Sequence, residues 1–138
     1  NRFFSPDIDI EKMELTPGFG FSHPAELALS LRWIAIMANK VDCSLAASTG
    51  IHDGDAVIKQ LLAGADAVQV ASCLYKNGNH HIGVMLKWLE DWMTTKGCRG
   101  LADFKGKLSQ ERSTDPSIYE RTQFMRYFGG KKDNLSQE

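Results

Sequence analysis

The sequence predicts an α/β fold with parallel strands, on two observations. Helical and strand-like patterns alternate along the chain, and the connections between them are short. This alternation is typical of strands joined by right-handed crossover helices, which makes the strands parallel. The pattern excludes an all-β fold and a helical bundle.

The helices are predicted from apolar residues that recur at helical spacing. Pro24 suits the first turn of one helix. Asp53 is a candidate N-cap for the next, and Gly64 stands where a left-handed C-cap belongs. The periodicity predicts helices over residues 24–38, 54–63, 78–95 and 118–128.

The strands are predicted over residues 41–47 and 66–71, which are short apolar runs between helical patterns. The segment from residue 5 through Ser22 is rich in Asp, Pro and Gly and is predicted to be a long loop. Residues 101–108 are expected to dock irregularly on the body, and residues 129–138 to fray.

Composition excludes several classes of function. The 138 residues are 43% hydrophobic and 24% charged, as in ordinary soluble domains. With 16 Lys and Arg against 17 Asp and Glu, no net charge attracts nucleic acid or an anionic membrane. No apolar run approaches the roughly 20 residues that span a bilayer, and no signal-peptide pattern is present. We therefore expect a cytoplasmic protein without nucleic-acid or membrane partners.

Cysteine and histidine give no metal pattern. The cysteines are Cys43, Cys73 and Cys98, which lack CxxC spacing and are predicted to be reduced, buried and inert. The histidines are His23, His52, His80 and His81, which lack metal-ligand spacing and are predicted to cap helices or to be solvated. His52 is the candidate exception, because it follows a turn of small residues.

Two strand-to-helix turns are rich in small residues, namely Ser48-Thr49-Gly50 and Ala71-Ser72. Small side chains let backbone N–H groups close on an anion, and a following helix N-terminus favours negative charge. From these residues alone, a phosphate site and an ordinary pair of turns both remain open.

A longer series of motifs resembles the carboxy-terminal part of the dihydroorotate dehydrogenases, in the order and spacing of that family. The motifs are Ala47-Ser48-Thr49-Gly50-Ile51, Gly54-Asp55-Ala56, Leu61-Leu62-Ala63-Gly64-Ala65, Val68-Gln69-Val70, Leu74-Tyr75-Lys76-Asn77-Gly78 and Ala102-Asp103-Phe104-Lys105-Gly106-Lys107-Leu108. The resemblance covers residues 1–110. Residues 111–138 are expected to form a helical extension and a tail.

The resemblance implies the carboxy-terminal half of a (β/α)8 TIM barrel, because a whole barrel needs about 250 residues. It also implies an FMN cofactor, whose phosphate the family holds in the turns after the last two strands. The implied cofactor contacts are Ser22, Ser48, Thr49, Gly50, Ala71 and Ser72. Thr49-Gly50 stands where the family usually has a Gly pair, and Ala71-Ser72 where it usually has Gly-Thr.

The implied activity is oxidation of dihydroorotate or a related dihydropyrimidine, with hydride transfer to FMN. Asn1 resembles the family's pyrimidine-binding Asn, but Arg2 follows it where the family has Ser or Thr. The position of the family's catalytic base precedes Asn1, so no catalytic residue is assigned and the chain alone is expected to be inactive. The implied partners are the missing amino-terminal half of the barrel and further copies in a homo-oligomer.

Two alternatives remain open. The same turns could bind a phosphorylated substrate in a barrel enzyme without flavin. The chain could also be a non-catalytic half barrel that packs against a partner.

Overall fold

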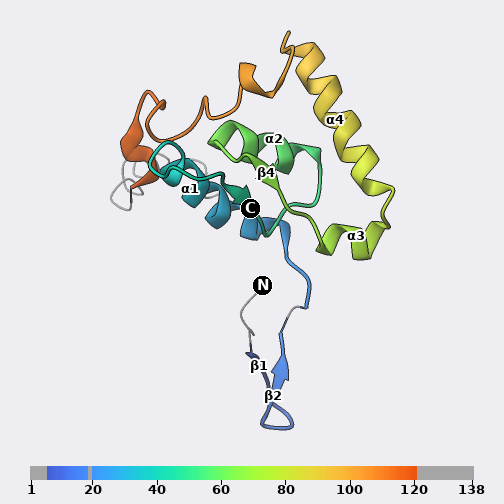
Figure 1. Ribbon diagram of the computed structural model, residues 1–138. Helices are drawn as coiled ribbons and strands as arrows, with labels where there is room; N and C mark the ends of the chain where they lie inside the picture. The colour runs from blue at the N-terminus through green and yellow to red at the C-terminus, as the bar shows by residue number, and fades with distance from the viewer. Residues whose placement is uncertain (1–5, 19, 121–138) are drawn as a thin grey trace, which may run out of the picture.

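The computed structural model describes residues 6–18 and 20–120 of the chain. Figure 1 shows a hairpin that projects from a body of helices around a short sheet. The elements are β1 (Pro6–Asp9), β2 (Glu14–Pro17), the 3-10 helix η1 (Pro24–Glu26), α1 (Leu27–Met37), β3 (Ala46–Ala47), α2 (Gly54–Ala63), β4 (Ala67–Val68), α3 (Ser72–Asn77), α4 (His81–Thr95), and the 3-10 helices η2 (Leu101–Asp103) and η3 (Pro116–Tyr119).

The central sheet is parallel, as predicted. β3 pairs with β4 in the register Ala46 with Ala67 and Ala47 with Val68. The strands are shorter than the predicted 41–47 and 66–71, although a bond of 2.8 Å from the Gln69 N–H to the Ala47 carbonyl continues the ladder. Residues 42–44 stay exposed and outside it, so the predicted burial of Cys43 is wrong.

The helix α2 has the bounds predicted for it. The Asp53 side chain accepts from the Ala56 N–H at 2.8 Å, and Gly64 ends the helix with φ 120°. α2 packs against both α1 and α4 (Figure 1). Pro24 begins a 3-10 turn that leads into α1, rather than α1 itself. The buried core lies on both sides of α2, because Ile51 and Ala56 pack towards α1 while Ile58 and Leu61 pack towards α4.

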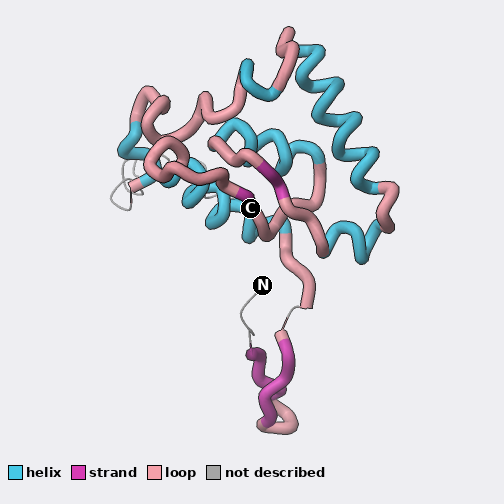
Figure 2. Tube along the Cα trace, viewed as in Figure 1, coloured by secondary structure: helices cyan, strands magenta, loops and turns pink. Residues whose placement is uncertain are grey.

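The predicted helix 78–95 begins later, at His81, and a separate helix, α3, precedes it. Gly78 separates the two helices: its N–H caps the Leu74 carbonyl at 2.8 Å, and its φ of 81° is a left-handed conformation that glycine adopts without strain. The turn after β4 is therefore immediately followed by a short helix, as Figure 2 shows.

The segment 6–17 forms an antiparallel hairpin, so the predicted long loop is wrong over this range. Ile8 and Leu15 face each other in the register, and their side chains are 62% and 72% exposed. The alternation of Asp7, Ile8 and Asp9 is strand-like, but two short strands bury too little to stand out in the sequence.

The segment after η2 docks on the helices, as predicted. Phe104 is 2% exposed and meets the Trp92 ring edge-on at 4.9 Å between centroids. The Gly106 N–H donates to the Leu61 carbonyl at 2.9 Å. Of the predicted helix 118–128, Ile118 and Tyr119 belong to the 3-10 turn η3, and Glu120 follows it in an extended conformation. Residues 121–138, the predicted tail included, lie outside the described residues. In the described part of the chain, no helix combines the length and apolarity needed to cross a bilayer.

Asp66 joins the sheet to the docking segment, and its charge is expected to stabilise the fold above pH 3.8. Its carboxylate binds Lys105 Nζ and accepts from the Leu45 N–H at 2.8 Å. The hydrogen bond from Lys105 is the main cause that lowers the Asp66 pKa from 3.8. A lowered carboxyl pKa stabilises the fold above 3.8, and this contribution disappears as pH falls further.

We expect Asp66→Asn to lower the free energy of unfolding by at most about 1 kcal/mol at pH 7, because the pair is partly exposed. The difference from wild type should shrink below pH 3.8. Urea unfolding at pH 7 and pH 3 measures both. Asp91→Asn is the control, since Asp91 pairs with Lys87 on an exposed helix face. Equal losses in both variants would contradict the special role of Asp66.

Candidate functional site

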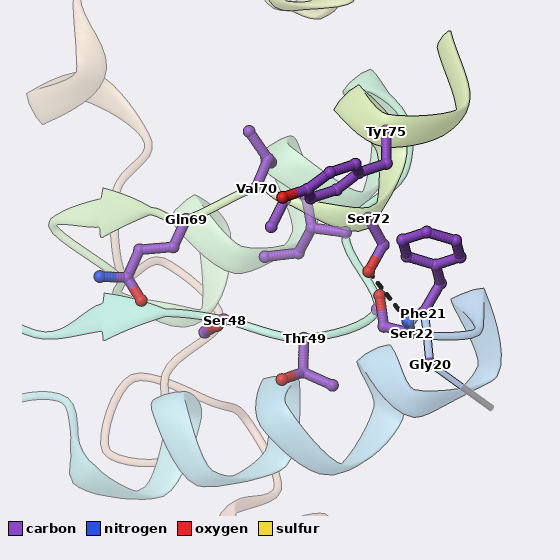
Figure 3. Close-up of a pocket in the computed structure, with 12 residues that line it drawn as sticks. Gly20, Phe21, Ser22, Ser48, Thr49, Gln69, Val70, Ser72 and Tyr75 are labelled. Carbon is purple, nitrogen blue, oxygen red and sulfur yellow. Dashed lines mark hydrogen bonds between the residues drawn. The ribbon is translucent and has the colours of Figure 1, made fainter. Parts of the chain in front are cut away.

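A cleft opens at the carboxyl ends of β3 and β4. Its volume is about 580 Å³, and its walls come from the turns after both strands and from the segment before η1. All six residues predicted as cofactor contacts line it, namely Ser22, Ser48, Thr49, Gly50, Ala71 and Ser72. Figure 3 shows four of them, Ser22, Ser48, Thr49 and Ser72, around this cleft. The structure therefore brings together segments that lie up to 50 residues apart in the sequence.

The turn after β3 presents its backbone to the cleft. In Figure 3 the Thr49 side chain points away from Val70 and Ser72 on the opposite wall. Gly50 is buried with φ 77°, and a Cβ there would lie 2.2 Å from the Leu27 backbone nitrogen at the start of α1. A side chain at Gly50 would thus strike α1. Because Gly50 has no side chain, the turn can lie directly against the start of α1.

Thr49 also has a φ of 77°, which is strained for a β-branched residue. We expect Thr49→Gly to raise the free energy of unfolding by about 1 kcal/mol, because relief of the strain exceeds the entropy that glycine gains in the unfolded chain. Chemical denaturation measures the change.

Asn39→Gly is the control for Thr49→Gly, because Asn39 has a φ of 66° but asparagine tolerates this region. No gain in stability is expected there. A Thr49→Gly variant no more stable than wild type would contradict the strain at Thr49.

The two serines across the cleft are joined to each other. The Ser22 N–H donates to Ser72 Oγ at 2.9 Å, and Figure 3 marks this bond. Ser22 is 7% exposed, and its Oγ lies 3.0 Å from His52 Nε2. Because Ser72 Oγ accepts from an N–H, its own proton remains available to donate to a ligand.

The cysteine nearest to the cleft is not an activated nucleophile. Cys73 follows Ser72 directly, but it is fully buried, and that burial raises the pKa of its thiol. A thiol held protonated at neutral pH is a poor nucleophile. The predicted burial of Cys73 is confirmed.

Six further residues line the cleft that were not predicted as contacts, and Phe21, Gln69 and Tyr75 are among them. Phe21 and Tyr75 pack ring against ring at 5.5 Å on one side, and Gln69 leaves β4 on another. Phe21 and Tyr75 lie 54 positions apart, so no local pattern could have paired them. The strand period offered one signal for Gln69, as a polar residue between Val68 and Val70.

The remaining predicted residues are placed as follows. Asn1 and Arg2 lie outside the described residues. His23 caps η1, accepting from the Ala25 N–H at 3.2 Å, which confirms the capping prediction. Over residues 6–18 and 20–120, no three His, Cys, Asp or Glu side chains are grouped to hold a metal ion.

Comparison with known proteins gives a consistent set of relatives, although no protein-family model matches. The chain is 29% identical over 111 residues to dihydroorotate dehydrogenase A (fumarate) of Lactococcus lactis, covering 77% of this chain and 35% of that protein. It is 32% identical over 111 residues to the probable dihydroorotate dehydrogenase A (fumarate) of Enterococcus faecalis, covering 75% and 35%. The chain belongs to the dihydroorotate dehydrogenase family.

A third relative and one solved structure extend this result. Identity is 30% over 89 residues to the catalytic subunit of dihydroorotate dehydrogenase B (NAD(+)) of Alkaliphilus metalliredigens, covering 64% of this chain and 29% of that one. The crystal structure of a dihydroorotate dehydrogenase from Eimeria tenella, in complex with ferulenol, superimposes with a TM-score of 0.58 and 24% identity. That match covers 70% of this chain and 25% of the other, and it shows a shared fold.

The chain spans about a third of the length of the dihydroorotate dehydrogenases it matches. The family membership and the α/β class predicted from the sequence are confirmed.

Proposed function

We propose that the chain supplies the last strand and helix units of an FMN-binding (β/α)8 barrel, and that the cleft holds the FMN phosphate. The observation that carries the proposal is the convergence of two small-residue turns at the carboxyl ends of adjacent parallel strands. Barrel enzymes place their active sites at this end, and commonly bind phosphate in such turns. Thr49 and Gly50 would offer backbone N–H groups, and Ser72 a hydroxyl donor.

The chemistry of the cleft fits a phosphate. Its described lining contains no Asp or Glu that would repel an anion, and no Lys or Arg that would neutralise one. The polar groups are backbone amides, Gln69 and hydroxyls such as Ser48 and Ser72. Neutral donors of this kind suit an anion that is bound in contact with the backbone. The turn at Gly50 has no side chain, and one placed there would clash with the start of α1.

The proposed reaction is oxidation of dihydroorotate or a related dihydropyrimidine. FMN, when bound, supplies the hydride acceptor. The residues of this chain would bind and orient the cofactor, and Asn1 would contact the pyrimidine. We assign proton removal to another part of the barrel and propose no residue of this chain as the catalytic base.

The sheet offers a surface for the rest of a barrel. β4 pairs with β3 on one edge, and no described strand pairs with its other edge. Beside β4, Val57, Val68, Met85 and neighbouring apolar side chains line a groove of about 230 Å³. We propose that further strand and helix units cover this groove, and that the complete protein forms a homo-oligomer.

The experiment that tests the function uses the complete barrel protein, purified without added cofactor. We expect a flavin absorption spectrum, release of FMN as the chromophore on denaturation, and bleaching of the bound flavin by dihydroorotate under anaerobic conditions. A colourless protein that binds other phosphate esters would favour the barrel enzyme without flavin. A protein that binds neither would contradict the proposed site.

A further inference from the structure

A chain of hydrogen bonds joins four segments around the cleft. The Ser22 N–H donates to Ser72 Oγ at 2.9 Å, and Ser22 Oγ lies 3.0 Å from His52 Nε2. His81 Nε2–H donates to the His52 backbone carbonyl at 2.9 Å. Ser22 and His52 therefore link four segments: the one before η1, the one before α2, and the starts of α3 and α4.

The two serine hydroxyls differ in what they can offer a ligand. Ser72 Oγ accepts from a backbone N–H, so its proton is free for an anion whatever the state of its neighbours. Ser22 has a single hydroxyl proton, and its only side-chain partner among the described residues is His52 Nε2. When His52 Nε2 is an acceptor, the Ser22 hydroxyl donates its proton to Nε2. When Nε2 carries a proton, it donates to Ser22 Oγ, and the Ser22 hydroxyl can then donate to another acceptor.

We propose that His52 is a positioning residue that sets the donor capacity of Ser22 for the ligand's phosphate. In the ligand-bound state His52 Nε2–H donates to Ser22 Oγ, and the Ser22 hydroxyl donates to a phosphate oxygen. This inference rests on the proposed function of the cleft as a phosphate site. It adds a residue that the family resemblance did not assign, and one that acts through Ser22 rather than by contact with the ligand.

The surroundings of His52 leave this role open to its imidazole. Two nearby carboxylates each accept a backbone hydrogen bond: Asp53 accepts from the Ala56 N–H at 2.8 Å, and Glu26 accepts from the His23 N–H at 2.6 Å. His81 holds the backbone carbonyl of His52 and does not compete for its ring. His52 is half-buried, and its Nε2 lies 3.0 Å from Ser22 Oγ.

The test measures dissociation constants of FMN and riboflavin for variants of the complete protein, because only FMN carries the phosphate. His52→Leu removes the donor and should weaken FMN binding about tenfold, with riboflavin binding unchanged. His52→Gln places an amide donor near the position of Nε2 and should stay within about threefold of wild type. His80→Leu is the matched control, since His80 is exposed and is not among the residues that line the cleft.

A double-mutant cycle with Ser22→Ala shows whether His52 acts through Ser22. In the Ser22→Ala background, His52→Leu should cause no further loss of FMN affinity. Additive losses, equal weakening of FMN and riboflavin, or a Gln variant as weak as the Leu variant would each overturn the assignment of His52. Absence of FMN binding in the wild-type protein would instead refute the proposed function itself, so the two failures are distinguishable.

Discussion

Replacing Gly50 with valine is expected to lower the free energy of unfolding by at least about 3 kcal/mol and to abolish FMN binding with it. The Gly50 φ of 77° is unfavourable for any β-branched residue. A Cβ there would lie 2.2 Å from the Leu27 nitrogen and 2.9 Å from the Glu26 carbonyl carbon. These are backbone atoms of a helix start and cannot move aside as a flexible side chain would.

The control for Gly50 compares two alanine variants. Gly97 has a similar φ of 68°, but a Cβ there would meet nothing within 4 Å. Gly97→Ala should cost about 1 kcal/mol from the backbone alone, and Gly50→Ala clearly more. Thermal or urea unfolding measures both. Equal losses of stability in the two variants would mean that the steric contact with α1 does not destabilise Gly50→Ala. Because Gly50 is a requirement of the fold, loss of flavin in its variants cannot by itself identify a ligand site.

Ser72→Ala is the sharper probe of the ligand. Loss of one hydroxyl bond to a charged phosphate should weaken FMN binding by roughly ten- to a hundredfold, on the order of 1.5–3 kcal/mol. The Ser22 N–H also loses its acceptor, so a stability loss of about 1 kcal/mol is expected alongside. Titration followed by the quenching of flavin fluorescence measures the affinity.

Ser72→Thr separates the hydroxyl from the loss of stability. Threonine keeps the donor at the start of α3, and it is the residue that the family usually has at this position. FMN affinity should return to within a few-fold of wild type. If Ser72→Thr binds FMN as weakly as Ser72→Ala, the phosphate does not depend on this hydroxyl.

Elements whose signals are local were predictable from the sequence. The bounds of α2 follow from Asp53 and Gly64, which stand next to the helix they delimit. The parallel sheet follows from the order of patterns. The lengths of β3 and β4 do not, because a strand ends where its partner ends and residues 42–44 have no partner in the sheet.

Elements that depend on a single conformation or on distant partners were not predictable. α3 is separate from α4 because Gly78 takes a φ of 81°, whereas glycine in a helical pattern is often merely tolerated. The hairpin of β1 and β2 was missed because its apolar residues remain exposed. Short amphipathic alternation with no buried face resembles a loop in sequence.

The candidate site was predictable as a set of turns but not as a network. Small residues after each strand, together with the family motifs, led to six of the residues that line the cleft. The bonds from Ser22 to His52 and to Ser72 span 30 and 50 residues, and no local pattern encodes them. The aromatic pair of Phe21 and Tyr75 was missed for the same reason.

The central claim is that the cleft binds FMN through the phosphate group of the cofactor. The most direct measurement compares the dissociation constants of FMN and riboflavin for the complete protein, by calorimetric titration of the apoprotein. FMN is predicted to bind at least about tenfold more tightly, because riboflavin lacks the group that Ser72 and the Thr49-Gly50 backbone would hold. Equal affinity for the two flavins would contradict the claim.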